Sequence, residues 1–233
     1  MKLFFGQIYP EVIIHDEEQN HISKVLRMRA GEEIVVTDGE GNAAKGRISF
    51  EGKKTVLTEV EILQQAEEFV PKLHVAIAPT KNIDRIEFFV EKATELGITE
   101  ITFLNTEKTE RRHLNIDKIR KQAVAASKQS LRFRFPVIND LTKLNEFISS
   151  LDSEKTYICH CNDSLQRIDL QKINTDIGSD KITFLVGPEG DFSDKEIQMM
   201  AEKNIQAVSL GRQRLRTETA GVFIAAWNYT KMI

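Results

Sequence analysis

The sequence predicts an α/β protein in which a small, mostly β segment precedes a larger segment of alternating strands and helices. Before residue 64, three short apolar runs are separated by turn residues, which is typical of antiparallel strands. From residue 72, apolar runs alternate with amphipathic helical stretches, which is typical of an α/β domain. We therefore expect two domains, residues 1–70 and residues 71–233.

The first domain is expected to contain three strands and one helix. Residues 33–37, 43–50 and 55–62 are apolar or alternating runs, and glycine-containing turns separate them. Only residues 16–28 place apolar side chains at helical spacing. Residues 64–71 are polar and end in proline, so we expect the linker there.

The second domain is expected to alternate strands with helices. Ser193 and Glu196 have the spacing of a capping box at the start of a helix. Residues 142–149, 157–160 and 165–173 continue the pattern less clearly. The expected strands are 73–78, 101–104, 182–186 and 207–210, and the expected helices are 83–96, 115–129, 193–203 and 217–231.

Composition favours a cytoplasmic protein. The chain has 41% hydrophobic and 29% charged residues, and no run approaches the roughly 18 apolar residues of a membrane span. The first residues are too few for a signal peptide. Cys159 and Cys161 flank His160, which is too small a set of ligands for a metal site. We expect both thiols to lie on one buried strand face and no metal to bind.

Basic residues gather in three stretches of a chain whose net charge is −3. Residues 107–136 carry nine Lys or Arg and three acids, which is a local net charge of +6. Residues 21–30 carry three basic residues and no acid, and residues 212–216 are basic again. Localised basic stretches on a mildly acidic protein indicate a defined polyanion site.

Two glycine turns predict a ligand pocket. Gly187-Pro188-Glu189-Gly190 follows the strand ending at Val186, and Gly211 follows the strand ending at Leu210. Glycine at such a turn lets a ligand approach the backbone amides. Because both turns lead into helices, we expect them to form a small-molecule pocket at the carboxyl edge of the sheet.

Six segments spread along the chain carry a family resemblance: Val25–Glu32, Lys92–Gly97, Glu110-Arg111, Gln129–Arg132, Leu185–Gly190 and Leu210–Ala220. They resemble the RsmE-type family of the SPOUT superfamily, bacterial methyltransferases that act on uridine N3 of 16S ribosomal RNA. One departure is Asp191, where the family often has a second glycine, and we expect cofactor binding to tolerate it.

The resemblance implies a fold, a cofactor and partners. It implies a PUA-like β-barrel for RNA binding at residues 1–70, followed by a SPOUT-type parallel sheet with a deep trefoil knot. It further implies S-adenosylmethionine bound by the knotted loops, and 16S ribosomal RNA of the small ribosomal subunit as substrate. A homodimer with the active site at its interface is also implied. The apolar residues Val222, Phe223 and Trp227 of the last helix agree with a partner surface.

Site residues follow from the turns, the resemblance and the chemistry of N3 methylation. N3 of neutral uridine carries a proton, so a base and a positive charge near the uracil oxygens should assist. Arg216 is the candidate for the charge, and Glu95, Glu189 and Glu218 are unranked candidates for the base. Lys92 aligns with a basic catalytic position of related knotted enzymes, although Lys92 and Glu95 also fit an ordinary helical ion pair. The cofactor-binding candidates are Leu185, Gly187, Glu189, Gly190, Leu210, Gly211, Leu215 and Thr219.

The basic stretches are expected to hold the RNA backbone while the target base turns into the pocket. Two other functions remain open: a 2′-O-ribose RNA methyltransferase, which would deprotonate a hydroxyl, and a non-catalytic RNA-binding assembly factor. Detectable cofactor binding would separate the second from an enzyme. The candidates for phosphate contacts are Lys24, Arg27, Arg111, Arg112, Arg120 and Arg132.

Overall fold

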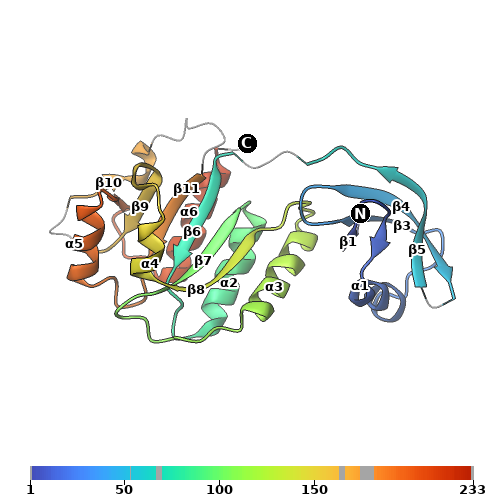
Figure 1. The fold of residues 1–233 in the computed structure, drawn as a ribbon, viewed down its shortest axis with the longest axis horizontal. Helices are drawn as coiled ribbons and strands as arrows, with labels where there is room; N and C mark the ends of the chain where they lie inside the picture. The colour runs from blue at the N-terminus through green and yellow to red at the C-terminus, as the bar shows by residue number, and fades with distance from the viewer. Residues whose placement is uncertain (1, 53, 67–69, 163–165, 174–180, 232–233) are drawn as a thin grey trace. The chain divides into compact units, whose positions relative to one another are not determined.

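The structure is a computed structural model that describes residues 2–231 except 53, 67–69, 163–165 and 174–180. The chain forms two compact units (Figure 1). The first comprises Met1–Glu68 with Val124–Phe135, and the second comprises Phe69–Ala123 with Pro136–Ile233. Each unit has its own apolar core.

The first unit is built on a five-stranded sheet of order β2-β1-β3-β4-β5 that curls into a nearly closed barrel. The three strands that the sequence predicts are present, and β3, β4 and β5 pair as an antiparallel meander. The sequence pattern missed β1 and β2. Because β1 pairs in parallel with β3, no hairpin turn connects β1 to β3 in the sequence. The strand bounds are β1 Leu3–Gln7, β2 Ile13–Ile14, β3 Glu33–Thr37, β4 Ala43–Glu51 and β5 Lys54–Ile62.

The helix predicted at residues 16–28 is shorter and irregular. It consists of α1 (Asp16–Asn20) and a π-helical turn at His21–Val25. The helical geometry stops before Arg27, which has a φ of 49°. Ile22 is fully buried in the core of the unit, whereas Val25 and Leu26 are exposed, so the predicted apolar face is confirmed only at Ile22.

Residues 124–135, the end of α3 (Ile116–Gln129) and the loop after it, pack with the first unit. Lys128 forms an ion pair with Glu18, and Thr37 Oγ1 donates a hydrogen bond to the carbonyl of Phe133 at 3.0 Å. The ring of Phe135 lies 5.2 Å from that of Phe5. Part of the basic stretch therefore has structural partners.

The second unit has a seven-stranded sheet of order β10-β12-β9-β11-β6-β7-β8, in which all pairings are parallel. The strands predicted at 73–78, 101–104, 182–186 and 207–210 are confirmed, whereas the sequence pattern did not clearly resolve β8, β9 and the short β10. Leu165 of the range 165–173 lies outside the described residues. The bounds are β6 Lys72–Ile77, β7 Glu100–Asn105, β8 Val137–Lys143, β9 Thr156–Cys159, β10 Ile168–Asp169, β11 Lys181–Val186 and β12 Gln206–Ser209.

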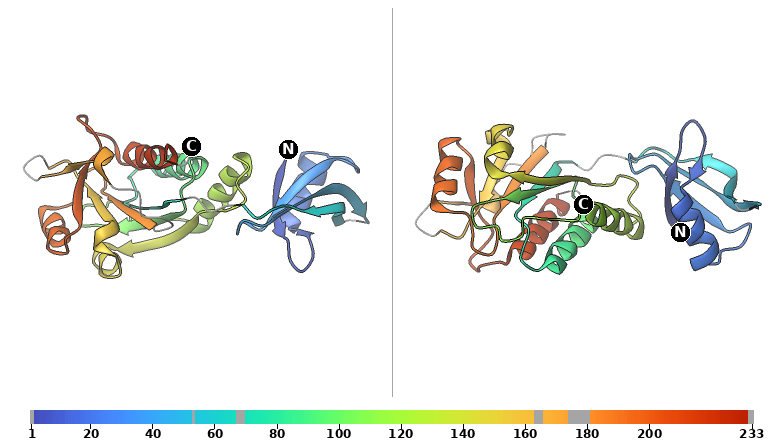
Figure 2. Two further views of the ribbon diagram at one scale, coloured as in Figure 1. Left: turned by 90° about the horizontal axis from the view of Figure 1, so that it is seen from above. Right: turned by 60° about the horizontal axis from the view of Figure 1, so that its bottom comes forward.

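Helices cover both faces of this sheet (Figure 2). On one face, α2 (Ile83–Glu95), α3 and α6 (Thr217–Tyr229) bury apolar side chains, and on the other, α4 (Leu144–Ser149) and α5 (Asp194–Glu202) do so. The predicted capping box at the start of α5 is present, with both reciprocal bonds between Ser193 and Glu196. No helix in the described part of the chain is long and apolar enough to span a membrane.

A buried histidine makes the stability of the second unit dependent on pH. His74 of β6 is 2% exposed, and its Nε2 lies 2.8 Å from Thr102 Oγ1. Burial lowers the pKa of His74 to about 4, although Glu100 nearby opposes the shift. The unfolded chain binds the proton with a pKa near 6.5. Lowering the pH through the range from 6.5 to 4 therefore lowers the free energy of unfolding.

We predict that His74→Gln removes this pH dependence. Between pH 7.5 and pH 5, the native protein should lose about 2 kcal/mol more of its unfolding free energy than the variant does. Urea denaturation at both pH values measures the difference. Equal losses in the two proteins would contradict the assignment, since the remaining titrating groups are common to both.

Candidate active site

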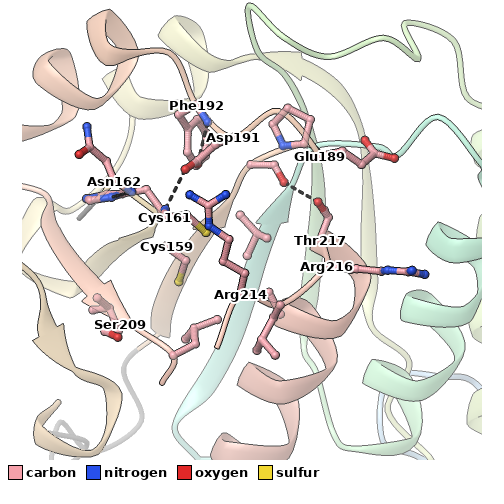
Figure 3. A pocket seen from close by; sticks show the side chains of 18 of the residues that line it. Cys159, Cys161, Asn162, Glu189, Asp191, Phe192, Ser209, Arg214, Arg216 and Thr217 are labelled. Carbon is pink, nitrogen blue, oxygen red and sulfur yellow. Dashed lines mark hydrogen bonds between the residues drawn. The ribbon is translucent and has the colours of Figure 1, made fainter. Parts of the chain in front are cut away.

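A cavity of about 720 Å³ lies at the carboxyl edge of the sheet in the second unit (Figure 3). Most of its wall is made by the ends of β9, β11 and β12 and the residues that follow them, and these strands are neighbours in the sheet. The volume lies within the range of small-molecule and cofactor sites. The structure thus brings the two glycine turns together at one cavity. The sequence-predicted site residues that line it are Gly187, Glu189, Gly190, Leu210, Gly211, Leu215 and Arg216.

The turn after β11 is tightly packed. A Cβ at Gly187 would lie 3.1 Å from both the backbone nitrogen and the ring of Phe192, so this position leaves little room for a side chain. The hydroxyl of Thr217 donates a hydrogen bond to the carbonyl of Gly187 at 2.9 Å. The start of α6 is therefore fastened to the turn after β11.

The turn after β12 is open. Gly211 has a φ of 132°, which disfavours residues with a side chain, and a Cβ there would meet no atom within 4 Å. Because Gly211 also lines the cavity, its missing side chain leaves the backbone accessible to a ligand.

The loop after β9 is the part of the wall that sequence reasoning missed. β9 lies between β11 and β12, a position that only the strand order reveals. Cys159 at its end is buried, and burial raises the pKa of its thiol. Cys161 is only partly buried and lies beyond the strand, so the prediction that both thiols share one buried strand face is wrong. Its backbone N–H donates to Asp191 Oδ2 at 2.7 Å.

Five basic side chains lie on the cavity wall. Arg214 and Arg216 extend to opposite sides of the segment before α6, and Arg214 is directed toward Asp191 and Cys161 (Figure 3). Arg216 is exposed, and its backbone is the N-cap of α6 without a side-chain capping bond. The five are Lys108, Arg167, Arg212, Arg214 and Arg216.

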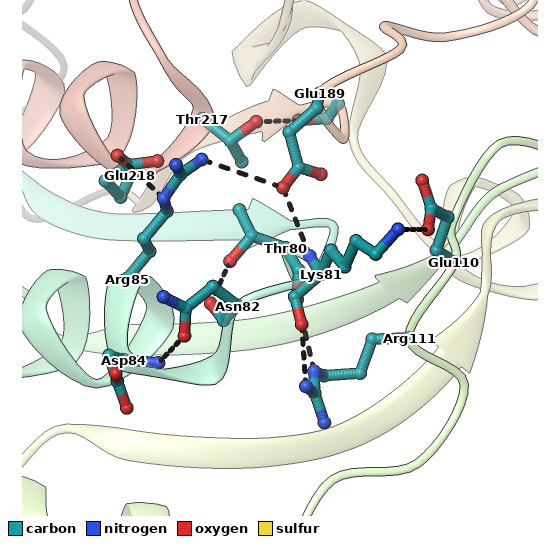
Figure 4. Close-up of polar contacts among 11 residues, drawn as sticks. Thr80, Lys81, Asn82, Asp84, Arg85, Glu110, Arg111, Glu189, Thr217 and Glu218 are labelled. Atoms are coloured by element: carbon teal, nitrogen blue, oxygen red, sulfur yellow. Dashed lines mark hydrogen bonds and ion pairs between the residues drawn. The ribbon is translucent and has the colours of Figure 1, made fainter.

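Two of the three candidate carboxylates meet at Arg85 (Figure 4). Its guanidinium lies 3.9 Å from Glu189 and 3.8 Å from Glu218, distances that make ion pairs without hydrogen bonds. Glu189 also accepts a hydrogen bond from the backbone N–H of Lys81 at 3.1 Å. Glu218 is 8% exposed, and its Oε2 has no hydrogen-bond partner among the described residues. The sequence offered one signal for Arg85, its place in the first turn of α2.

The third carboxylate is elsewhere. Glu95 pairs with Lys92 on α2 at 3.0 Å, and Lys92 also bonds to Glu91. Hydrogen bonds to Glu91 and Glu95 raise the pKa of Lys92, which keeps its amine protonated. Neither Lys92 nor Glu95 lines the cavity. The geometry in this chain is that of the helical ion pair.

Two of the cofactor-binding candidates also lie off the wall. Leu185 is fully buried within β11, in the core beneath α4 and α5. Thr219 is exposed on α6 and does not line the cavity. Their neighbours Val186 in β11 and Ala220 in α6 line the cavity instead.

The candidates for phosphate contacts fall into two groups. Lys24, Arg27 and Arg112 are exposed. The other three have structural partners or are buried. Arg111 donates to the carbonyls of Thr80 and Lys81, and Arg120 donates to that of Ile138. Arg132 is 7% exposed, so its side chain is not accessible to a ligand in solution. The same burial lowers the pKa of its guanidinium to about 10.

No cluster of three or more His, Cys, Asp or Glu that could hold a metal ion occurs within the described ranges of the chain. The cavity instead offers backbone groups at glycine turns, apolar side chains and a basic rim. That combination suits an organic ligand with polar edges.

Comparison with known proteins assigns the class. Residues 67–228 match the family model described as RNA methyltransferase domain, and residues 14–61 match the one described as RNA methyltransferase PUA domain. Fold and cavity therefore belong to an RNA methyltransferase that carries a PUA domain. Within this class, the chain belongs to the ribosomal RNA small subunit methyltransferase E (RsmE) family.

Three relatives illustrate the match. The Rickettsia conorii ribosomal RNA small subunit methyltransferase E is 28% identical over 211 residues, which cover 89% of this chain and 84% of the relative. A probable rRNA-methyltransferase from Porphyromonas gingivalis has a TM-score of 0.87 at 31% identity, covering 100% and 98% of the chains. The Neisseria gonorrhoeae ribosomal RNA small subunit methyltransferase E, solved bound to S-adenosyl methionine, has a TM-score of 0.83 at 28% identity, covering 99% and 98%.

Proposed function

We propose that this protein transfers a methyl group from S-adenosylmethionine to N3 of a uridine in 16S ribosomal RNA of the small subunit. The observation that carries the proposal is the cavity between three adjacent loops, which includes both glycine turns. The fold around it matches that of a relative solved with this cofactor along 99% of the chain. An enzyme acting on this RNA would work in the cytoplasm.

The cavity fits the cofactor. Gly187, Gly190 and Gly211 would hold its adenosine part through backbone groups, since Gly211 leaves open space where a side chain would stand. When bound, the cofactor supplies an electrophilic methyl group. Because transfer is an in-line displacement, the main task of the protein is to hold donor and acceptor in line.

The residues of this chain would also manage the proton and the charge of the base. N3 of uridine must lose its proton and gain the methyl group, so negative charge develops on the uracil oxygens. Arg216 would stabilise that charge from the rim of the cavity. Glu189, which lines the cavity, and Glu218, which meets Glu189 at Arg85 without lining the cavity, are the candidates to accept the proton. Glu95 and Lys92 are left out because they pair with each other away from the cavity.

The decisive experiment is mass-spectrometric analysis of nucleosides in 16S ribosomal RNA from cells with and without the gene. Loss of 3-methyluridine on deletion, and its return with purified enzyme and cofactor, is the expected result. Loss of a 2′-O-methylated nucleoside instead would establish the alternative ribose methyltransferase. Unchanged RNA together with undetectable cofactor binding would establish a non-catalytic factor.

We further infer a homodimer. Phe223 on α6 and Phe88 on α2 are 40% and 49% exposed, and these two helices pack together. Trp227 is 5% exposed and belongs to the core, so the expectation that it adds to a partner surface is wrong. Burying two exposed aromatic rings favours association.

Light scattering should therefore give a mass twice the 26.6 kDa of one chain. A Phe88→Glu, Phe223→Glu variant should give the mass of a monomer, while Tyr9→Glu in the first unit, whose side chain is also exposed, should leave the dimer intact. A native protein that is monomeric at working concentration would contradict the inferred homodimer.

We also infer the deep trefoil knot that the family resemblance implies for the region from β11 to α6. It is supported by the strand order, in which β9 separates β11 from β12 although the turns after all three line one cavity. An experimental electron-density map with an unbroken trace from residue 181 to residue 231 tests it. A trace that passes through no loop of the chain would overturn it.

We predict that the exposed basic residues Lys24, Arg27 and Arg112 hold the RNA backbone. Each phosphate contact releases counterions, so Arg27→Ala and Arg112→Ala should each flatten the plot of log affinity against log salt by about 0.7 to 0.9 units. Cofactor affinity should not change. The control is Lys54→Ala, an exposed lysine outside the basic stretches. Unchanged slopes in both arginine variants would mean that the RNA is bound elsewhere.

A further inference from the structure

The loop Gly187–Phe192 contains a residue with left-handed backbone geometry. Asp191 has a φ of 61°, in a region that Asp tolerates better than most residues with a side chain but that is uncommon outside glycine. Such a conformation persists only where surrounding contacts impose it. The contacts of Asp191 should therefore account for its left-handed conformation.

The carboxylate of Asp191 joins two loops of the cavity. Its Oδ1 accepts a hydrogen bond from the backbone N–H of Phe192 at 2.8 Å, and its Oδ2 accepts one from the backbone N–H of Cys161 at 2.7 Å. Cys161 follows β9 and Phe192 follows β11, and both residues line the cavity. Hydrogen bonds to a carboxylate are short and strong. One side chain thus fastens two neighbouring wall segments to each other.

A second side chain holds the same loop from another element. Lys108, in the loop after β7, donates from Nζ to the carbonyls of Gly190 at 2.9 Å and of Phe192 at 3.1 Å. With the bond from Thr217 to Gly187, side chains of the protein hold the main chain of the loop at several points.

We propose that Asp191 is a positioning residue that builds the cofactor cavity before the cofactor arrives, with Lys108 in a supporting role. A cavity wall that is already ordered loses less conformational entropy when the cofactor binds, so the affinity for the cofactor is higher. Asp191 acts through the loops after β9 and β11, and not through the reacting atoms. The identity of the ligand rests on the proposed function, whereas the ordering of the loops does not.

Three substitutions at Asp191 separate the effect of its hydrogen bonds from that of its backbone conformation, and a fourth variant tests Lys108. Asp191→Gly relieves the unfavourable φ and removes both bonds, Asp191→Ala keeps the φ and removes both, and Asp191→Asn keeps one acceptor. Lys108→Met removes the second support. The matched control is Asp38→Gly, because Asp38 Oδ1 accepts hydrogen bonds from the backbone N–H groups of Glu40 and Asn42 in a turn of the first unit.

The first measurement is amide hydrogen exchange of the ligand-free protein. The amides of Cys161 and Phe192 should exchange at least tenfold faster in Asp191→Gly and Asp191→Ala, and at an intermediate rate in Asp191→Asn. Exchange unchanged from the native protein in all of these variants would overturn the proposal. This readout does not depend on the cofactor.

The second measurement is affinity and turnover with S-adenosylmethionine. Asp191→Gly and Asp191→Ala should bind about tenfold more weakly and show a raised KM for the cofactor, with kcat at saturation within threefold of native and partial rescue in Asp191→Asn. Asp38→Gly should lower the melting temperature without changing the affinity. Native affinity in Asp191→Gly would overturn the proposal. No binding by the native protein would instead refute the proposed function.

Discussion

Replacing Arg216 by alanine is expected to lower kcat about 100- to 1,000-fold while leaving the affinity for S-adenosylmethionine within about threefold of native. Loss of one preorganised charge donor has an effect of that size when the charge exists only in the transition state. Arg216 is exposed on the rim of the cavity and makes no side-chain capping bond to α6, so its truncation leaves the fold intact. Single-turnover kinetics and calorimetry measure the two quantities.

Two further variants make the Arg216 experiment specific. Arg216→Lys keeps the charge but loses the planar fork, and should fall between the native protein and the alanine variant. Lys203→Ala removes the same charge from the exposed end of α5 and should leave kcat unchanged. If Arg216→Ala lost cofactor affinity and kcat by the same factor, Arg216 would be a binding residue.

Gly211→Val is expected to weaken cofactor binding more than 100-fold. The new side chain would stand in the open space beside Gly211 on the cavity wall, and a φ of 132° adds backbone strain of about 1–3 kcal/mol. Calorimetric titration measures the loss, and circular dichroism checks that the fold is kept.

The matched control separates strain from obstruction. Gly31 in the first unit has a φ of 88° and also meets no atom within 4 Å of its missing Cβ, so Gly31→Val brings comparable strain without touching the cavity. Both variants should lose stability, and only Gly211→Val should lose the cofactor. Binding by Gly211→Val within threefold of native would show that the cofactor lies away from this turn.

The sequence by itself determined the features that depend on neighbours along the chain. The apolar runs of β6, β7, β11 and β12 predicted strands, and the Ser193 capping box predicted the start of α5. The glycines at positions 187 and 211 predicted turns; Gly211 has a φ of 132°, which favours glycine, whereas Gly187 is packed against Phe192. The family resemblance drew on the same local segments and predicted the class of enzyme.

Only the tertiary structure decided which of these segments meet. It placed β9 between β11 and β12, joined Asp191 to Cys161 and brought Glu189 and Glu218 to Arg85. It also showed that Arg132 is buried and that Lys92 forms an ion pair with Glu91. Their residue types alone had suited RNA binding and catalysis. Parallel strand pairing and ion pairs between distant segments leave no periodic signal along the chain, because their partners are chosen by packing of the whole sheet.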